Sequence, residues 1–392
     1  MSCPHKSSKY QRLLNKLQKS RVFKSNTETP VQKLEKGEFM FRLAKSSLQI
    51  AGRNSDGKIL FGSLPLKNNS VNYAVTATHT QPPYKVVYID QPSAWWPPSA
   101  IAYSFYQMVD AGFNIINLAF MVDGQPQDMA LVWNRELAEP NPDTGKTYRD
   151  EILAYAHSKG TSIMLSTGGA TEGAFAATDP QVYATNVANF VLATGLDGVD
   201  FDLENFSPGL IAPGSTSSQN TINWLISVTE HTRTLLGPYA LISHAPQAPY
   251  FGAIGNSACW TGPLGGYTAV YYGNQDTARI DFFNVQYYNQ GNTNYTTYNT
   301  IFINSGNDFP YSAVQQLAQW IPINKFILGK PMQTTDASTG YNTPQEINSI
   351  ILSAKNNIGW SNGGIMTWQW CYNVANPEDF ARNWLSTATN GY

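Results

Sequence analysis

The feature that most constrains the fold is a regular alternation of short apolar segments and amphipathic segments from Tyr84 to the C-terminus. The apolar segments have the length and composition of β-strands, and most are followed by apolar residues at helical spacing. Strands are predicted over 84–90, 116–122, 161–169, 198–204, 239–247, 280–289, 325–332 and 363–370. Helices are predicted over 99–112, 148–160, 180–195, 219–236, 343–357 and 376–387. Eight strands joined by helical crossovers predict an α/β fold, the (β/α)8 or TIM barrel.

A doubly wound α/β sheet is the alternative, but no glycine-rich nucleotide loop follows any early strand, so the barrel is preferred. A chain of 392 residues has room for one barrel domain or two smaller domains. No apolar run approaches the ~18–20 residues of a membrane span, so we expect no transmembrane segment.

Charge divides the chain into two parts. Residues 1–67 carry 14 Lys or Arg and 4 Asp or Glu, a balance of +10, whereas the remainder carries −12 within a net charge of −2. This asymmetry predicts a basic N-terminal extension and linker over residues 1–83 and a (β/α)8 barrel domain over residues 84–392. The extension should contain a short basic amphipathic helix within residues 5–24 and a β-hairpin or small sheet within residues 38–66.

The job of the extension stays open at this point. A propeptide, an anchor to an anionic surface and an export address are three functional interpretations, and a solvated helix packed against the acidic barrel is the simpler one. The N-terminal segment lacks the 7–15 apolar residues of a secretory signal peptide. We therefore expect an extracellular protein that is exported by a non-classical or unrecognised route.

The segment LDGVDFDLENF, residues 196–206, indicates a functional site. Asp200, Asp202 and Glu204 alternate with apolar residues, so a strand would place the three carboxyls on one face, about 7 Å apart. Three neighbouring carboxyls in a partly buried site cannot all ionise cheaply, so at least one should hold a proton near neutral pH. Asp197 falls on the other face and is interpreted as a hydrogen-bonding residue at the start of the strand.

The motif DGVDFDLE resembles the D-G-x-D-x-D-x-E signature of family 18 glycoside hydrolases, the chitinases and their relatives. Four further segments are similar to motifs of this family in the expected order, closest to its short plant-type members: LSTGG (165–169), APQAP (245–249), VQYYN (285–289) and GGIMTW (363–368). The resemblance covers roughly residues 84–387 and leaves the extension unexplained.

The resemblance implies a set of site residues. The catalytic residues would be Glu204, Asp202, Asp200 and Tyr288. The substrate-binding residues would be Trp368, Gln286, Asn289, Gly168, Gly169 and Gln247, to which we add Trp95 in the loop after the first strand. The two glycines have a second interpretation, in which they only allow the third strand to end tightly. For the Trp95–Trp96 pair, a sugar platform and plain loop packing are equally good interpretations.

The carboxyl arrangement also predicts a mechanism. An ordinary retaining glycosidase places two carboxyls about 5–5.5 Å apart on opposite sides of the scissile bond. Asp202 and Glu204 come from one strand and lie on one side of the sugar, so the nucleophile must be the acetamido oxygen of the substrate. Glu204 would protonate the leaving oxygen, Asp202 would hold the acetamido N–H, and Asp200 would share a proton with Asp202.

The expected function is therefore substrate-assisted, retaining hydrolysis of β-1,4-linked N-acetylglucosamine polymers such as chitin. Only about ten residues separate the seventh strand from the next helix, which leaves no room for a walling domain and favours an open groove with endo-type cleavage. The segment 250–279 could rebuild part of a wall. The alternatives are an endo-β-N-acetylglucosaminidase acting on N-glycans, a non-hydrolytic sugar-binding protein and a host-directed toxin component.

No cofactor and no metal are expected, because the five His show no ligand spacing. The three Cys are widely separated and predict neither a disulfide framework nor a metal site. The expected partner is chitin or another glycan that contains N-acetylglucosamine. We expect no nucleic-acid partner and a monomeric state.

Overall fold

A computed structural model describes three strands of the N-terminal part and residues 80–391 with gaps at 91–95, 173–177, 205, 207–214, 253–265, 275–279 and 362. Contacts divide the chain into two compact units, Met1–Asn72 and Tyr73–Tyr392. The helix predicted within residues 5–24 lies outside the described residues.

The N-terminal unit contains a three-stranded antiparallel sheet. Its strands are β1 (Phe39–Ala44), β2 (Ser47–Arg53) and β3 (Ile59–Pro65), in the order β1-β2-β3. The register pairs Ala44 with Ser47 and Arg53 with Ile59, so each strand turns back on its neighbour. A small sheet thus forms over the segment where the sequence alternates, and the break at residues 54–57 falls between β2 and β3.

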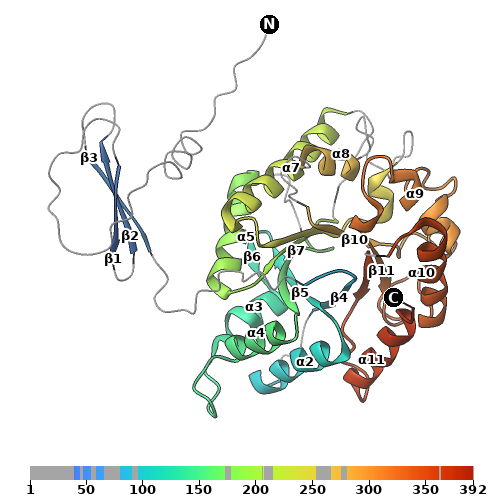
Figure 1. Cartoon of the computed structure of the whole chain (residues 1–392), viewed down its shortest axis with the longest axis horizontal. Coiled ribbons are helices and arrows are strands. Elements are labelled where there is room, and N and C mark those ends of the chain that lie inside the picture. Colours follow the sequence, from blue (N-terminus) through green and yellow to red (C-terminus); the bar gives the residue numbers. More distant parts are fainter. Residues whose placement is uncertain are drawn as a thin grey trace, which may run out of the picture. The chain divides into compact units, whose positions relative to one another are not determined.

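The second unit is a closed barrel of eight parallel strands, which confirms the predicted fold (Figure 1). In sheet order the eight strands are β4 (Tyr84–Ile89), β12 (Gly364–Trp368), β11 (Phe326–Pro331), β10 (Phe282–Gln286), β9 (Leu241–His244), β8 (Gly198–Asp202), β7 (Ser162–Gly168) and β5 (Ile115–Val122). Parallel pairing of β4 with β5 closes the ring. The two-residue strand β6 (Gln125–Pro126) adds an antiparallel edge to β5.

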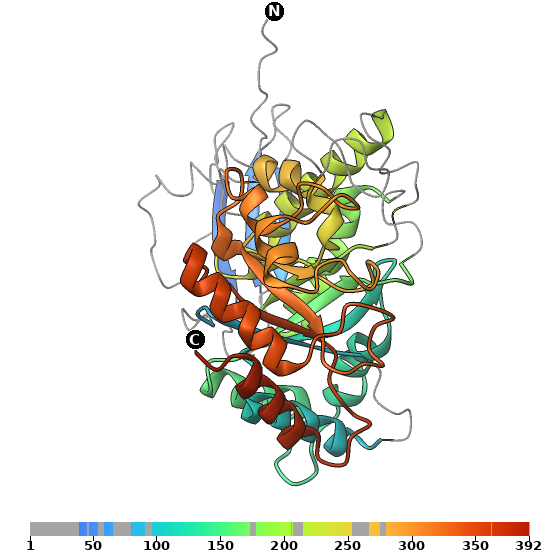
Figure 2. The same cartoon turned by 90° about the vertical axis from the view of Figure 1, so that its right-hand side faces the viewer.

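Helices cover the outside of the barrel, as Figures 1 and 2 show. Most of the crossovers contain a regular helix: α2 (Pro98–Ala111), α3 (Asp128–Asn134), α4 (Tyr148–Ser158), α5 (Pro180–Thr194), α7 (Thr216–Leu236), α8 (Gly266–Asn274) and α10 (Pro344–Ile358), with α11 (Pro377–Ala388) after the last strand. Between β10 and β11 the described helical segments are short: η5 (Asn299–Ile303), α9 (Val314–Leu317) and η6 (Ile323–Lys325). Further short turns are η1 (Glu136–Ala138) and η3 (Ala248–Phe251).

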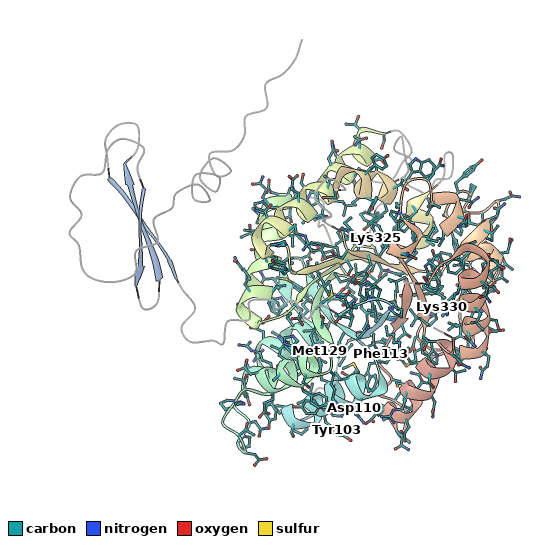
Figure 3. All side chains as sticks on the ribbon, viewed as in Figure 1. Tyr103, Asp110, Phe113, Met129, Lys325 and Lys330 are labelled. Carbon is teal, nitrogen blue, oxygen red and sulfur yellow. The ribbon has the colours of Figure 1, made fainter. Side chains whose placement is uncertain are left out.

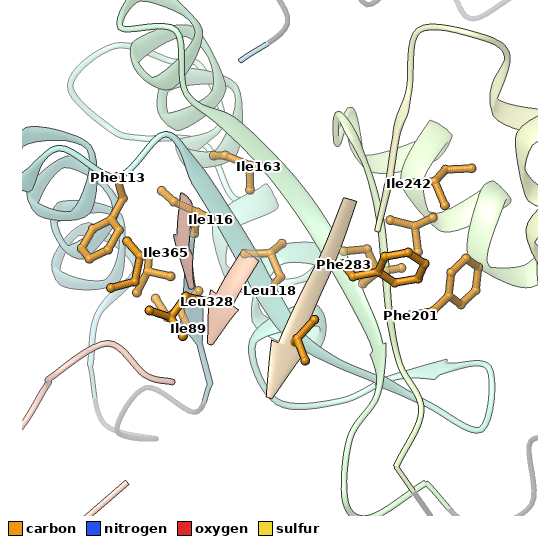
Figure 4. Packing of buried hydrophobic residues seen from close by; sticks show 14 of the residues in the cluster. Ile89, Phe113, Ile116, Leu118, Ile163, Phe201, Ile242, Phe283, Leu328 and Ile365 are labelled. Atoms are coloured by element: carbon orange, nitrogen blue, oxygen red, sulfur yellow. The ribbon is translucent and has the colours of Figure 1, made fainter. Parts of the chain in front are cut away.

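Alternation along each strand separates two apolar layers. Residues such as Ile89, Ile116 and Phe201 point outward and pack with the surrounding helices in the larger cluster (Figure 4). Their strand neighbours, among them Tyr88 and Ile115, form a smaller cluster inside the barrel. Burial of apolar area is the main source of stability, and the outer layer supplies most of it. The inner layer can therefore carry polar groups without loss of the fold.

Asp197 connects the start of β8 to its neighbours. Its carboxylate accepts a hydrogen bond from the backbone N–H of Ile163 at 2.8 Å and pairs with His157 Nε2 at 2.9 Å. The hydrogen bond with Asp197 raises the pKa of His157. The interpretation of Asp197 as a hydrogen-bonding residue at the start of the strand is confirmed.

A buried glutamate joins the segment after β7 to the end of β5. Glu172 Oε2 accepts hydrogen bonds from the backbone N–H of Asp123 at 3.1 Å and from the Tyr183 hydroxyl at 3.4 Å. Burial, together with the neighbouring Asp123 carboxyl, raises the pKa of Glu172 to about 7. The folded protein therefore holds a proton on this carboxyl that the unfolded chain releases at lower pH.

We predict that Glu172→Gln changes the pH dependence of stability. Between the usual pKa of 4.5 and the folded value of about 7, the unfolded chain binds fewer protons at this site, so the free energy of unfolding falls as pH rises. Glutamine mimics the protonated acid and removes this fall. The variant should gain up to about 3 kcal/mol over the parent above pH ~7 and little below pH ~4.5. Denaturant unfolding at about pH 5 and about pH 8 measures the difference.

The exposed Glu139 offers a matched control, because Glu139→Gln makes the same chemical change on the surface. Its effect on stability should stay within about 0.5 kcal/mol at both pH values. A Glu172→Gln gain that is the same at both pH values would contradict a buried, protonated carboxyl.

Candidate active site

The centre of the barrel holds Asp200, which is fully buried on β8. Four side chains from four other strands donate hydrogen bonds to its two oxygens. The hydroxyls of Tyr88 and Ser166 donate to Oδ2 at 2.7 and 2.9 Å. Ser243 Oγ and Asn284 Nδ2 donate to Oδ1 at 2.5 and 3.0 Å. Burial raises the pKa of Asp200, and the four hydrogen bonds oppose that rise.

Asp202 and Glu204 form a carboxyl pair above Asp200. Burial, the charge of Glu204 and then the charge of Asp200 raise the pKa of Asp202 well above its usual range. Burial also raises the pKa of Glu204, while hydrogen bonds from Gln286, Asp202 and Gln247 oppose the rise. The two carboxyls hydrogen-bond to each other, so the pair shares one proton.

The predicted extent of this strand was two residues too long. β8 ends at Asp202, and Glu204 lies in the segment that follows. The last backbone bond of the β7–β8 pair runs from the N–H of Gly169, the residue after β7, to the carbonyl of Asp202. Glu204 nevertheless stays on the side of Asp202, at the carboxyl end of the barrel.

Gln286, the last residue of β10, links the two carboxyls to the neighbouring strands. Its Nε2 donates to Asp202 Oδ1 and to the carbonyl of Ala245, both at 2.9 Å. Gln247 forms an isolated bridge with Gln286 and also donates to Glu204. The amide groups therefore fix the orientation of both carboxyls.

A pocket of about 290 Å³ opens above this pair, and Glu204 lies in its wall. Its lining residues are Asp90, Phe120, Asp128, Ala170, Thr171, Glu204, Gln286, Tyr288, Asn289 and Trp368. The Trp368 ring stacks on Phe120, with centroids 5.8 Å apart and planes 21° apart. The pocket thus combines an aromatic wall with carboxyl, amide and hydroxyl groups, as small-ligand sites do.

Tyr288 keeps its proton in this setting. Burial and the charges of Asp202, Glu204 and Asp200 raise the pKa of the Tyr288 phenol well above its usual range. A neutral phenol can donate a hydrogen bond to a bound carbonyl at any ordinary pH. Asn289 follows in the left-handed region, with φ 65°, and its Oδ1 accepts hydrogen bonds from the N–H and Oγ of Ser338.

A buried lysine supports the segment that carries Tyr288. Lys330 is labelled in Figure 3. Its Nζ donates to three carbonyls, those of Tyr287 at 2.9 Å, Tyr295 at 2.7 Å and Gly340 at 3.1 Å. Burial lowers the pKa of Lys330 to about 7. Because one ammonium group gathers three loop carbonyls, it restrains the backbone next to Tyr288.

Gly168 and Gly169 satisfy a steric requirement. Gly168 has φ 114°, and a Cβ atom there would lie 2.1 Å from the carbonyl oxygen of Asp202. Gly169 has φ 80°, and its Cβ would lie 2.9 Å from the ring of Phe120. Neither glycine belongs to the pocket lining, whereas the next two residues, Ala170 and Thr171, do. The structure therefore supports the interpretation that the glycines let β7 end tightly against the site.

We predict that Gly168→Ala destabilises the barrel by more than about 3 kcal/mol, because a backbone clash adds to the strain of a positive φ. Gly145→Ala is the matched control, since Gly145 has φ 73° but open space around its Cβ. The control should lose only the about 1 kcal/mol of backbone strain. Denaturant unfolding of both variants measures the difference, and equal losses would show that the Asp202 contact is unimportant.

The structure brings most of the predicted residues together. Glu204, Gln286, Tyr288, Asn289 and Trp368 line one pocket, and Asp202 and Gln247 contact Glu204. Asp200 lies beneath them, and its expected proton sharing with Asp202 stays a prediction, because Asp202 is paired with Glu204 here. Trp95 lies outside the described residues.

The sequence did not predict the four residues that donate hydrogen bonds to Asp200, nor five residues of the pocket wall. These are Tyr88, Ser166, Ser243, Asn284, Asp90, Phe120, Asp128, Ala170 and Thr171. Polar residues inside otherwise apolar strands, such as Asn284 in IDFFNVQ, were the available signal. Within the part of the chain that the structure describes, no group of three or more His, Cys, Asp or Glu could hold a metal ion. No described helix has the length and apolarity required to cross a bilayer.

Fold and site together define a (β/α)8-barrel protein with a carboxyl site at the carboxyl ends of its strands. The model of the family "Glycosyl hydrolases family 18" matches residues 84–389, so the chain belongs to this family.

Similar proteins carry chitinase names. Endochitinase 37 of Trichoderma harzianum is 26% identical over 276 residues, which cover 66% of this chain and 74% of the relative. Endochitinase 4 of Metarhizium robertsii is 27% identical over 287 residues, covering 67% and 74%. The crystal structure of a GH18 chitinase from Pseudoalteromonas aurantia matches with a TM-score of 0.56 and 25% identity, covering 78% of this chain and 99% of that one.

Proposed function

We propose that this protein hydrolyses β-1,4-linked N-acetylglucosamine polymers such as chitin, with retention and with the substrate's acetamido group as nucleophile. The observation that carries the proposal is the Asp202–Glu204 pair, which shares one proton at the wall of a pocket that contains Tyr288 and Trp368. Chitinase names among the similar proteins support the same substrate class.

The position of the two carboxyls argues against an enzymic nucleophile. Asp202 ends β8 and Glu204 follows two residues later, and the two side chains hydrogen-bond to each other. A retaining enzyme with its own nucleophile needs carboxyls on opposite faces of the sugar, about 5–5.5 Å apart. Two mutually bonded carboxyls reach the sugar from one side. A 2-acetamido oxygen on the substrate is then the group that can attack the anomeric carbon from the other side.

Each residue takes a definite step in this mechanism. Glu204 transfers a proton to the leaving glycosidic oxygen and afterwards accepts a proton from the attacking water. Asp202 accepts a hydrogen bond from the acetamido N–H and stabilises the positive charge that develops on the closing ring. The neutral phenol of Tyr288 donates to the acetamido carbonyl oxygen, which orients it for attack.

Asp200 lies beneath Asp202 and stabilises the charged states of that carboxyl during the reaction. The proton that the pair shares moves onto Glu204, which transfers it to the glycosidic oxygen, and Asp202 is left ionised to face the acetamido N–H. Asp200, whose pKa burial raises, can share a second proton with the ionised Asp202. The four donors around Asp200 hold its carboxyl in place during this exchange. Trp368 supports the apolar face of the sugar.

The wall of the site favours cleavage within long chains. Only residues 332–343 connect β11 to α10, a segment too short for an inserted domain that would close the groove. An open groove accepts a polymer at any point along its length. Parts of the segment 250–279 lie outside the described residues. Action on an insoluble extracellular polymer also requires export, which we include in the proposal.

We predict that Glu204→Gln lowers turnover by at least about 10²–10⁴-fold, because glutamine keeps the shape but has no transferable proton. The test digests colloidal chitin and an N-glycoprotein side by side and identifies the products by mass. The parent should release N-acetyl-chitooligosaccharides and leave the N-glycoprotein intact. Glu139→Gln, an exposed surface change of the same chemistry, should match the parent. Near-parental turnover by Glu204→Gln would assign the acid elsewhere.

We predict that catalysis depends on the acetyl group of the substrate. A thiazoline analogue of N-acetylglucosamine imitates the cyclised intermediate and should inhibit, and fully deacetylated chitosan should resist cleavage. Inhibition constants and reducing-end release from both polymers measure this dependence. Rapid hydrolysis of fully deacetylated polymer would show that an enzymic group is the nucleophile.

A further inference from the structure

A second cavity, of about 340 Å³, lies between the first helix of the barrel unit and the segment that follows β12. Its lining residues are Trp96, Ala100, Tyr103, Ser104, Gln107, Tyr372, Val374, Ala375 and Pro377. We call it the α2 cavity. It shares no lining residue with the pocket that contains Glu204. Trp96 and Tyr372 follow β4 and β12, so this part of the cavity lies toward the carboxyl ends of the strands, as the active site does.

One face of α2 forms a wall of this cavity. Ala100, Tyr103, Ser104 and Gln107 are spaced i, i+3, i+4 and i+7, which places them in one stripe along the helix. Ser104 is buried, whereas Tyr103 is 57% exposed and its ring is available at the surface (Figure 3). A small residue, an aromatic ring and a side-chain amide thus lie next to one another on a rigid element.

The lining of the cavity also contains an aromatic pair. Trp96 and Tyr372 pack edge to face, with ring centroids 5.2 Å apart and planes 83° apart. The Tyr372 hydroxyl is buried and has no hydrogen-bond partner among the described residues. An unsatisfied buried hydroxyl costs free energy, so a ligand that offers it a hydrogen bond binds more strongly.

The phenol of Tyr372 also connects the α2 cavity electrostatically with the active-site pocket. Burial and the charge of Asp90 raise the pKa of the Tyr372 phenol well above its usual range, so Tyr372 lies within electrostatic reach of Asp90. Asp90 in turn lines the pocket of Glu204. One residue of the α2 cavity therefore senses the charge of a residue that lines the active-site pocket.

The chemistry of the lining selects the class of ligand. Every residue in it is uncharged, so it offers no ion pair to a nucleic acid, a phosphate group or a charged peptide. Aromatic rings suit the C–H face of a pyranose, and the amide of Gln107 and the hydroxyl of Tyr372 suit sugar hydroxyl or acetamido groups. A neutral, amphipathic sugar matches this combination.

We propose that the α2 cavity is a second carbohydrate site, which holds N-acetylglucosamine units of the polymer outside the catalytic pocket. The inference rests on the proposed function, because it takes its ligand from the same polymer. The site adds contacts that only a long or insoluble substrate can make. A short soluble substrate occupies the catalytic pocket alone, so the two substrate types report on the two sites separately.

The experiment compares Tyr103→Ala with Tyr103→Phe, which keeps the ring. Each change is placed in the inactive Glu204→Gln chain, and retention on colloidal chitin is measured at several concentrations. Tyr103→Ala should weaken retention by about 3- to 10-fold, the effect of losing one aromatic contact, and Tyr103→Phe should restore it. Tyr239→Ala is the control: Tyr239 is 59% exposed and precedes β9, at the other end of the barrel. It should retain parental binding.

A second measurement separates failure of this inference from failure of the proposed function. The same Tyr103 changes are made in the active chain, and release of chromophore from a soluble N-acetyl-chitooligosaccharide glycoside is followed. A parent that neither cleaves this substrate nor binds chitin would refute the proposed function. A parent that does both, with Tyr103→Ala chitin binding unchanged, would refute the second site alone. Equal losses on soluble and insoluble substrate would also overturn it, because Tyr103 would then act through the catalytic pocket.

Discussion

The structure depends on how the barrel accommodates the buried carboxylate of Asp200. A carboxylate in an apolar interior is unstable unless hydrogen bonds replace its water, and here four donors come from four strands, β4, β7, β9 and β10. These strands meet around one point only when the sheet is closed. The polar centre of the barrel and the closure of the barrel therefore require each other, while the apolar layer between strands and helices supplies most of the stability.

The geometry above Asp200 follows from this anchoring. Because β8 is fixed at Asp200, Asp202 is held one step higher and Glu204 reaches the pocket wall. Gln286 and Gln247 then orient the two carboxyls, and Gly168 allows the neighbouring chain to approach Asp202 closely. Three carboxyls in one buried column cannot all be ionised, so their raised pKa values keep a proton within the site. The same crowding costs stability, which is a usual consequence of building a reactive site.

The two hollows differ in the forces that they offer. The pocket of Glu204 combines carboxyls with Trp368 and the phenol of Tyr288, and it suits a reaction in which charge develops. The α2 cavity is uncharged and aromatic, and it suits binding without chemistry. In the proposed function these properties are complementary, because a polymer that must be cut at one point must also be held at others.

The sequence by itself was sufficient to predict the barrel and to identify the three carboxyl residues at its centre. The eight strands were predictable because period-two and helical spacings are local properties, and Asp200, Asp202 and Glu204 were visible because carboxyls are rare in buried strands. Tertiary structure alone decided which partners these acids meet. Tyr88 and Asn284 are 196 residues apart along the chain, yet both donate to Asp200. Likewise, Gln286 at the end of β10 donates to Asp202, which lies 84 residues away along the chain. Such partners are set by the register and closure of the sheet, which depend on all eight strands at once and leave no mark in any one segment.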